Sequence, residues 1–257
     1  MHQPRPQLRY SQAEWEVRCD LAACYQLAEL YGMSDMAVTH ISARIPGDGD
    51  FFLLNPFGML FDEITASSLI KVDLDGNVID GGSEEMNPAG FVIHSAIHMA
   101  RPELTCVMHS HTRANNAVAM QKEGLLPLSQ KAMLISSFVR YHDYEGASLN
   151  LGERERILDD LGDGRILILR NHGALTAGTS IAEAFCWMHK LEAACRFQVD
   201  GLSGGRELNW QSEEAVRSTA EQGRKLFGPG GPAAAGKLEW AALVRKLERE
   251  RGTNYRT

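Results

Sequence analysis

The sequence has no long apolar run. No stretch approaches the ~18 to 20 consecutive apolar residues that a membrane-spanning helix needs. The N-terminal region also has no apolar segment of the kind found in secretory signal peptides. We therefore expect a soluble protein without a membrane partner.

Cysteine is scarce, and its spacing follows no pattern. The five cysteines form an odd set without C-x-x-C spacing: Cys19, Cys24, Cys106, Cys186 and Cys195. Such a set predicts reduced thiols and hence a cytoplasmic protein.

Positive charge is in the minority, because 26 Lys and Arg stand against 33 Asp and Glu and give a net charge of −7. Nucleic acids and anionic membranes recruit proteins through clustered Lys and Arg, so we expect neither as a partner. Basic residues gather only near the C-terminus, where glutamates interleave with them as on a solvated helix end. We expect the tail that follows to be disordered.

What the sequence contains is the composition of a globular protein, with 44% hydrophobic and 23% charged residues. A chain of 257 residues suits one large domain. We place its core at about residues 12–200 and expect peripheral helices over about 205–257, after connectors rich in Gly and Pro.

Helices and short strands follow one another along this core. Apolar residues recur at three- and four-residue steps over 12–31, which indicates an amphipathic helix. Two strand pairs joined by turns are indicated by alternating or apolar segments: THISAR pairs with FFLLN, and the first half of KVDLDGNVI pairs with its second half. LTCVMHSH and RILILR indicate buried strands, the second followed by a turn closed by Gly173 and a long helix from about Ser180. The pattern predicts an α/β fold with a mixed or mostly antiparallel sheet covered by helices.

Three histidines carry the main chemical signal. His109 and His111 are two apart in a strand, so both side chains emerge on one face about 6.6 Å apart and can converge on an ion. His172 follows RILILR, at the strand end where ligand sites in α/β sheets are favoured. A catalytic metal usually has three protein ligands and one open position. The H-x-H pair by itself is also compatible with a polar strand end.

The segments around these histidines resemble the class II aldolase/adducin family. They are VMHSHT after RPEL, LRNHGALTAG, THISAR, LLNPFGMLFDEI, NPAGFVIHSAIH and YHDYEG, within about residues 15–200. The resemblance implies a three-layer α/β/α fold and a homotetramer. It also implies that His109, His111 and His172 bind a divalent metal, with zinc as the first choice and Mn, Fe or Co as alternatives.

Two departures from the family's sugar-phosphate aldolases argue against a phosphorylated substrate. Those enzymes carry Ser-Ser-Glu before the helix histidine, and its glutamate acts as acid/base, whereas residues 88–90 here read PAG. Their phosphate pocket uses Gly-Asn and Thr-Gly, which correspond here to TH at 39–40 and FG at 57–58, so the small backbone donors are mostly replaced. Glu84 or Glu85 is the alternative acid/base.

Further catalytic candidates are His94 on the NPAGF helix and His142 and Tyr144 in YHDYEG, because a neutral imidazole near pH 7 suits proton transfer. The four-residue spacing of His94 and His98 aims both along one side of the helix. The alternative role for His94 is that of a core histidine that orients a metal ligand. The alternative for His142 and Tyr144 is that they form a hydrogen-bonding pair at a strand end.

His40 and Arg44 in THISAR are candidates for pairing with a substrate carboxylate, and Arg170 before the N-H-G turn is another. A surface position on a solvated face is the alternative for each. Gly58 and Asn87, in the family-like segments, complete the predicted substrate-binding set.

These features predict a metal-dependent lyase, an aldolase or decarboxylase, that cleaves a carbon–carbon bond in a small non-phosphorylated hydroxy or oxo acid. Decarboxylation is easier to reconcile with the missing glutamate, since it needs no base to deprotonate a hydroxyl. The alternatives are a non-enzymatic adducin-like interaction module and an iron-dependent oxygenase on the same scaffold.

Overall fold

An eight-stranded sheet runs through the part of the chain that the computed structural model describes, residues 9–47, 50–81, 85–146 and 152–257. The strand order is β4-β3-β2-β1-β5-β8-β7-β6. Within this sheet β6 and β7 are parallel, and the other neighbouring strands are antiparallel. The predicted mostly antiparallel sheet is confirmed.

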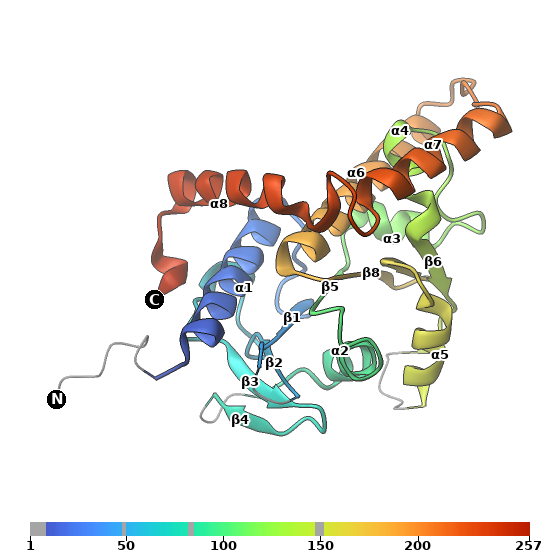
Figure 1. Cartoon of the computed structure of the whole chain (residues 1–257). Helices are drawn as coiled ribbons and strands as arrows, with labels where there is room; N and C mark the ends of the chain where they lie inside the picture. Colours follow the sequence, from blue (N-terminus) through green and yellow to red (C-terminus); the bar gives the residue numbers. More distant parts are fainter. Residues whose placement is uncertain (1–8, 48–49, 82–84, 147–151) are drawn as a thin grey trace.

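The elements appear in Figure 1. The strands are β1 (His40–Arg44), β2 (Phe51–Leu54), β3 (Ile70–Asp73), β4 (Val78–Asp80), β5 (Cys106–Ser110), β6 (Val139–His142), β7 (Ile166–Leu169) and β8 (Gly173–Gly178). The α-helices are α1 (Gln12–Leu30), α2 (Pro88–Ala100), α3 (Arg113–Ala119), α4 (Gln130–Ile135), α5 (Glu153–Leu161), α6 (Ile181–Ser203), α7 (Glu213–Phe227) and α8 (Lys237–Arg251).

Helices cover both faces of the sheet. On one face, α1 and α6 share a hydrophobic cluster with Met108 and Ile168. On the other, α2 and α5 pack against Val107 and Leu167. Successive strand residues point to opposite faces, so neighbours in the sequence serve different layers. The three-layer α/β/α arrangement that the sequence predicts is confirmed.

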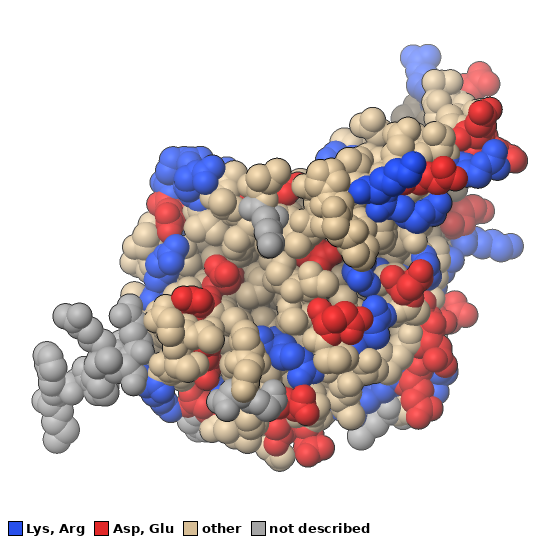
Figure 2. Space-filling view, viewed as in Figure 1, with Lys and Arg blue, Asp and Glu red and all other residues tan. Residues whose placement is uncertain are grey.

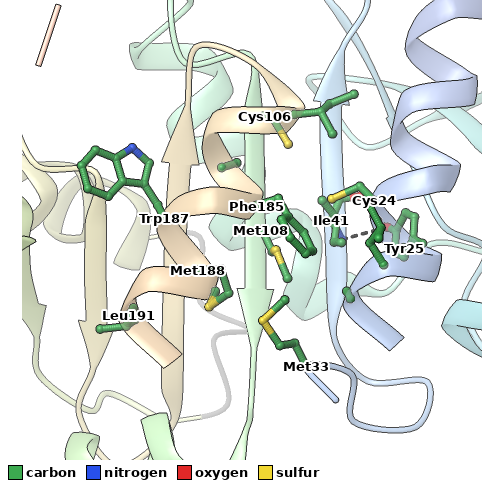
Figure 3. Close-up of a cluster of buried hydrophobic side chains, with 14 of the residues drawn as sticks. Cys24, Tyr25, Met33, Ile41, Cys106, Met108, Phe185, Trp187, Met188 and Leu191 are labelled. Atoms are coloured by element: carbon green, nitrogen blue, oxygen red, sulfur yellow. Dashed lines mark hydrogen bonds between the residues drawn. The ribbon is translucent and has the colours of Figure 1, made fainter. Parts of the chain in front are cut away.

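The larger cluster fixes α1 and α6 next to the strands that carry the histidines (Figure 3). Phe185 on α6 is fully buried there with Met108 of β5. The Tyr25 hydroxyl on α1 accepts the Ile41 N–H of β1 at 2.8 Å. Burial of a side chain such as Phe185 contributes about 2 to 3 kcal/mol, so this face anchors β1 and β5 firmly.

GALTAG forms the strand β8, although the sequence predicts only a turn before the long helix. All six residues are buried between β5 and β7, and none is a large apolar residue except Leu175. A Cβ at Gly178 would lie 2.5 Å from the Ala184 nitrogen, so only glycine lets α6 pack this closely. Pairing with β5 and β7, which the local composition does not reveal, makes this segment a strand.

The C-terminal tail is docked against α1, so the expectation of disorder is wrong. Tyr255 is 1% exposed and belongs to the main hydrophobic cluster, as does Leu247 of α8. The Tyr255 carbonyl oxygen accepts the Ala66 N–H at 2.8 Å, and the Thr257 carbonyl oxygen accepts the Ser67 N–H at 2.9 Å. None of the described helices combines the length and apolar character needed to span a membrane.

Candidate metal centre

His109 and His111 lie at the C-terminal end of β5, in the middle of the sheet. β5 pairs with β1 on one side and β8 on the other, and His109 lies opposite His40 and Leu175. The Nε2 atoms of His109 and His111 are 2.7 Å apart. β5 therefore delivers both rings to one point, as the H-x-H spacing predicts.

His172 reaches the same point from the turn between β7 and β8. Asn171 adopts φ 57°, a left-handed conformation that asparagine tolerates better than most residues. A Cβ at Gly173 would lie 2.6 Å from the Ser110 carbonyl oxygen and 2.9 Å from His111 Cδ2, so this turn needs glycine. Ligand nitrogens of the three histidines all lie within 4.8 Å of one another. The structure thus brings the predicted metal ligands together.

The hydrogen bonds on the far side of two rings leave the converging nitrogens free for a cation. His109 Nδ1 lies 3.1 Å from the Ala174 carbonyl oxygen, which can only accept, so Nδ1 carries the proton. His111 Nδ1 lies 3.2 Å from Asp35 Oδ2, which favours a proton there too. Both Nε2 atoms then present bare lone pairs, through which these rings would hold a divalent cation such as zinc.

Burial keeps two of these rings neutral. Burial, followed by the neighbouring His40, lowers the pKa of His109 well below its ordinary value. Burial and then His111 lower the pKa of His172 to about 4. Neutral imidazole is the form that binds a divalent metal, so both rings are in the ligand form at neutral pH.

A chain of buried polar side chains begins beside the metal centre. The His40 ring lies 5.1 Å from the His109 ring, centroid to centroid, and His40 Nδ1 lies 2.8 Å from His94 Nε2. Ser42 Oγ lies 2.6 Å from His94 Nδ1 and 2.7 Å from His98 Nε2. A donor on each group must meet an acceptor on the next, so the chain fixes the orientation of His40. His94 therefore meets the centre through its hydrogen bond with His40.

Gly90 on α2 leaves the space that the His40 ring fills. A Cβ at Gly90 would lie 2.7 Å from His40 Cδ2 and 2.8 Å from its Nε2. Gly90 belongs to the PAG segment at residues 88–90. An imidazole from β1 therefore occupies the space beside this segment.

His142 ends β6 and is held by α5. Its Nδ1 lies 2.7 Å from Asp160 Oδ2 and its Nε2 lies 3.4 Å from Glu153 Oε1. It is close enough to contribute to the lowered pKa of His172. Both ring nitrogens thus face carboxylates of α5, and a catalytic role for His142 stays a prediction.

The two arginine candidates make structural contacts. Arg44 pairs with Asp50 at 2.8 Å and donates to the His98 carbonyl oxygen. Arg170 donates to the Gln121 carbonyl oxygen at 2.8 Å. Their predicted pairing with a substrate carboxylate would have to compete with these bonds.

The remaining predicted residues lie at the surface or at its edge. Tyr144 is 58% exposed, and Glu85 is exposed as well. Gly58 has φ 96° in an exposed turn after β2. The Asn87 side chain donates to the Val38 carbonyl oxygen at 3.4 Å. Glu84 lies outside the described residues.

Two side chains of the site were not predicted from the sequence. Asp35, which holds His111, lies in the loop after α1, and no spacing relates it to the H-x-H segment. Ser42 joins His94 to His98, and its position two residues after His40 places it on the same face of β1. That parity was the available signal for Ser42.

Comparison with known proteins identifies relatives along most of the chain. The model of the class II aldolase and adducin N-terminal domain matches residues 19–199. The crystal structure of an aldolase II superfamily protein from Pseudomonas syringae is 49% identical, covers 98% of this chain and 99% of that one, and gives a TM-score of 0.91. An L-fuculose 1-phosphate aldolase from Glaciozyma antarctica PI12 is 28% identical, and the match covers 100% of this chain and 96% of that one with a TM-score of 0.82.

The same comparison reaches proteins named as adducins. Alpha-adducin of Rattus norvegicus is 40% identical over 264 residues, which are 97% of this chain and 35% of that protein. The chain therefore belongs to the class II aldolase and adducin N-terminal domain family, as its motifs predict.

Proposed function

We propose that this protein is a metal-dependent carbon–carbon lyase that acts by aldol cleavage or decarboxylation on a small, non-phosphorylated hydroxy or oxo acid. The observation that carries the proposal is the convergence of three imidazoles within 4.8 Å. The His109 and His111 rings donate their Nδ1 protons away from the meeting point, which suits metal ligands. Membership in a family with aldolases supports a lyase.

A bound divalent ion, with zinc as the first choice, supplies a Lewis acid for the enolate-like charge that both reactions develop. The chain's own task is positioning. Asp35 and the Ala174 carbonyl oxygen fix the His111 and His109 rings. His40, with Nδ1 2.8 Å from His94 Nε2 and its ring 5.1 Å from the His109 ring, would contact the substrate beside the three histidines. In this proposal His94 is a positioning residue.

The absence of phosphate from the proposed substrate rests on the pocket segments. Residues 39–40 and 57–58 replace most of the small backbone donors that cradle a phosphate. His40 also fills space beside Gly90 with a neutral ring, because burial lowers its pKa well below the ordinary value. L-fuculose 1-phosphate, the compound in the name of one relative, is therefore the comparison substrate.

Product analysis of the zinc-loaded protein tests this proposal. Hydroxy and oxo acids of three to six carbons are assayed beside L-fuculose 1-phosphate, with detection of carbonyl products and carbon dioxide. We expect cleavage of an acid, its loss in His109→Ala, and its retention in Arg245→Gln, an exposed position on α8 away from the centre. Cleavage of the sugar phosphate alone would contradict the proposed substrate class, and no cleavage of either class would contradict the lyase.

An adducin-like interaction module is the second candidate, favoured by the 40% identity with alpha-adducin. Such a module has no need of three converging imidazoles, and the complete set favours the enzyme. An iron-dependent oxygenase uses the same ligands, and oxygen consumption by the iron-loaded protein would distinguish it from a lyase.

A further inference from the structure

A cavity of about 480 Å³ lies between α6 and α8 beside the C-terminal end of α1. On α8 its wall is formed by Glu239, Leu243, Lys246 and Arg249, whose spacing places them on one face of the helix. Small-molecule sites typically measure about 300 to 1,000 Å³. The three histidines of the metal centre are not among the lining residues.

Four Lys and Arg side chains line this cavity against one carboxylate. They are Lys131 of α4, Lys190 of α6, and Lys246 and Arg249 of α8, and the carboxylate is Glu239. The whole chain has a net charge of −7, so this local excess runs against the overall composition. Positive charge gathered in a cavity raises the local concentration of anions.

Nearby carboxylates neutralise only part of the positive charge of these four side chains. Glu239 reaches Lys190 only at 4.0 Å, and Lys246 pairs with the half-exposed Glu250. Among the residues that the structure describes, Lys131 and Arg249 have no ion-pair partner. Figure 2 shows Lys and Arg side chains gathered over the C-terminal part of α8.

The inner wall of the cavity is aromatic. Phe185 is fully buried, and the Tyr31 and His189 rings meet edge to face with centroids 5.2 Å apart. Burial, with smaller contributions from Lys131 and Lys190, lowers the pKa of His189. The ring is therefore neutral at pH 7 and extends the aromatic surface.

We propose that this cavity binds a small anion in which a phosphate or carboxylate group is attached to a planar ring. Arg249 and Lys131 bind the anionic group through charge-assisted hydrogen bonds, and the rings of Tyr31 and His189 contact the planar part. The proposal is independent of the lyase activity, because none of its residues belongs to the metal centre.

Calorimetric titration of the zinc-loaded full chain with phenyl phosphate tests the proposal. Inorganic phosphate and phenol serve as probes for the two halves of the ligand. We expect one phenyl phosphate site per chain, weaker binding of phosphate and no measurable binding of phenol. Arg249→Gln and Lys131→Gln should each weaken the binding of phenyl phosphate by at least about tenfold, as expected for the loss of a charged hydrogen bond. The matched control Arg245→Gln, on the same helix outside the cavity, should bind as the wild type.

His109→Ala separates this site from anion binding at the metal, and it should retain phenyl phosphate binding. Equal binding by the wild type, Arg249→Gln and Lys131→Gln would overturn the proposal, as would loss of binding in His109→Ala. Absence of binding to the wild type at millimolar phenyl phosphate would overturn it too. Light scattering on each variant completes the test: an unchanged oligomeric state in Arg249→Gln supports a small-molecule site, whereas a changed one would overturn the proposal by identifying the cavity as a contact between copies of the chain.

Discussion

His98 should make the folded protein lose stability as the pH falls, because its buried site disfavours the charged form of the ring. The side chain is fully buried on α2, with Nε2 2.7 Å from Ser42 Oγ and the ring stacked on Phe52 at 4.9 Å. Burial, with a smaller contribution from Arg44, lowers its pKa from 6.5 to about 3. The folded state therefore resists a proton that the unfolded state accepts.

The sign of the effect follows from these two pKa values. The folded pKa is the lower one, so the stability contribution is fully present above the unfolded value of 6.5 and is lost as the pH falls toward 3. Between pH 7.0 and 5.5 a single such histidine lowers the free energy of unfolding by about 1.3 kcal/mol. Removing the titrating ring should remove this share of the pH dependence.

Urea unfolding, followed by circular dichroism in metal-free protein at constant concentration, measures this share. The loss of stability between pH 7.0 and 5.5 should be smaller in His98→Gln than in the wild type by about 1.3 kcal/mol. Ser42→Ala keeps the imidazole, so it should be less stable at both pH values with the wild-type pH dependence. An equal loss in the free energy of unfolding between pH 7.0 and 5.5 for His98→Gln and the wild type would contradict a low pKa of the buried His98.

Three further substitutions test other contacts. Gly90→Ala should displace the His40 ring, which lies 2.7 Å from the added Cβ, and should lower the free energy of unfolding by about 1 to 3 kcal/mol in urea titrations. Tyr255→Ala should cost about 3 kcal/mol in the same assay, because the ring is 1% exposed, and an unchanged midpoint would contradict docking of the tail. Arg18→Met should cost about 1 to 3 kcal/mol, because it removes the donor of the buried Leu69 carbonyl oxygen, 2.7 Å away, and leaves Glu14 paired with Lys71 alone at 3.2 Å.

The strands and the triad could be predicted because their signals are local. Alternation in THISAR and FFLLN predicts the pairing that places Ala43 opposite Leu53. The H-x-H spacing and the N-H-G turn predict the meeting of His109, His111 and His172. Each of these depends on strand geometry and turn chemistry that a few neighbouring residues determine.

The surroundings of the triad could not be predicted in the same way, because they depend on packing between distant segments. The α2 helix must lie on β1 before Ser42 can bridge His94 and His98. Asp35 reaches His111 only because α1 ends where it does. The strand β8 and the docked tail likewise depend on contacts with α6 and α1, and a one-dimensional pattern contains none of these.

Metal content measured together with ligand substitution tests the central claim most directly. After saturation with zinc and dialysis, elemental analysis of the purified wild type should give one ion per chain. The metal content of His109→Ala and His172→Ala should fall close to zero, while Arg245→Gln, at an exposed position on α8, keeps the full ion. A wild type that retains no stoichiometric metal, or a His172→Ala variant that retains all of it, would contradict a single centre built from β5 and the turn between β7 and β8.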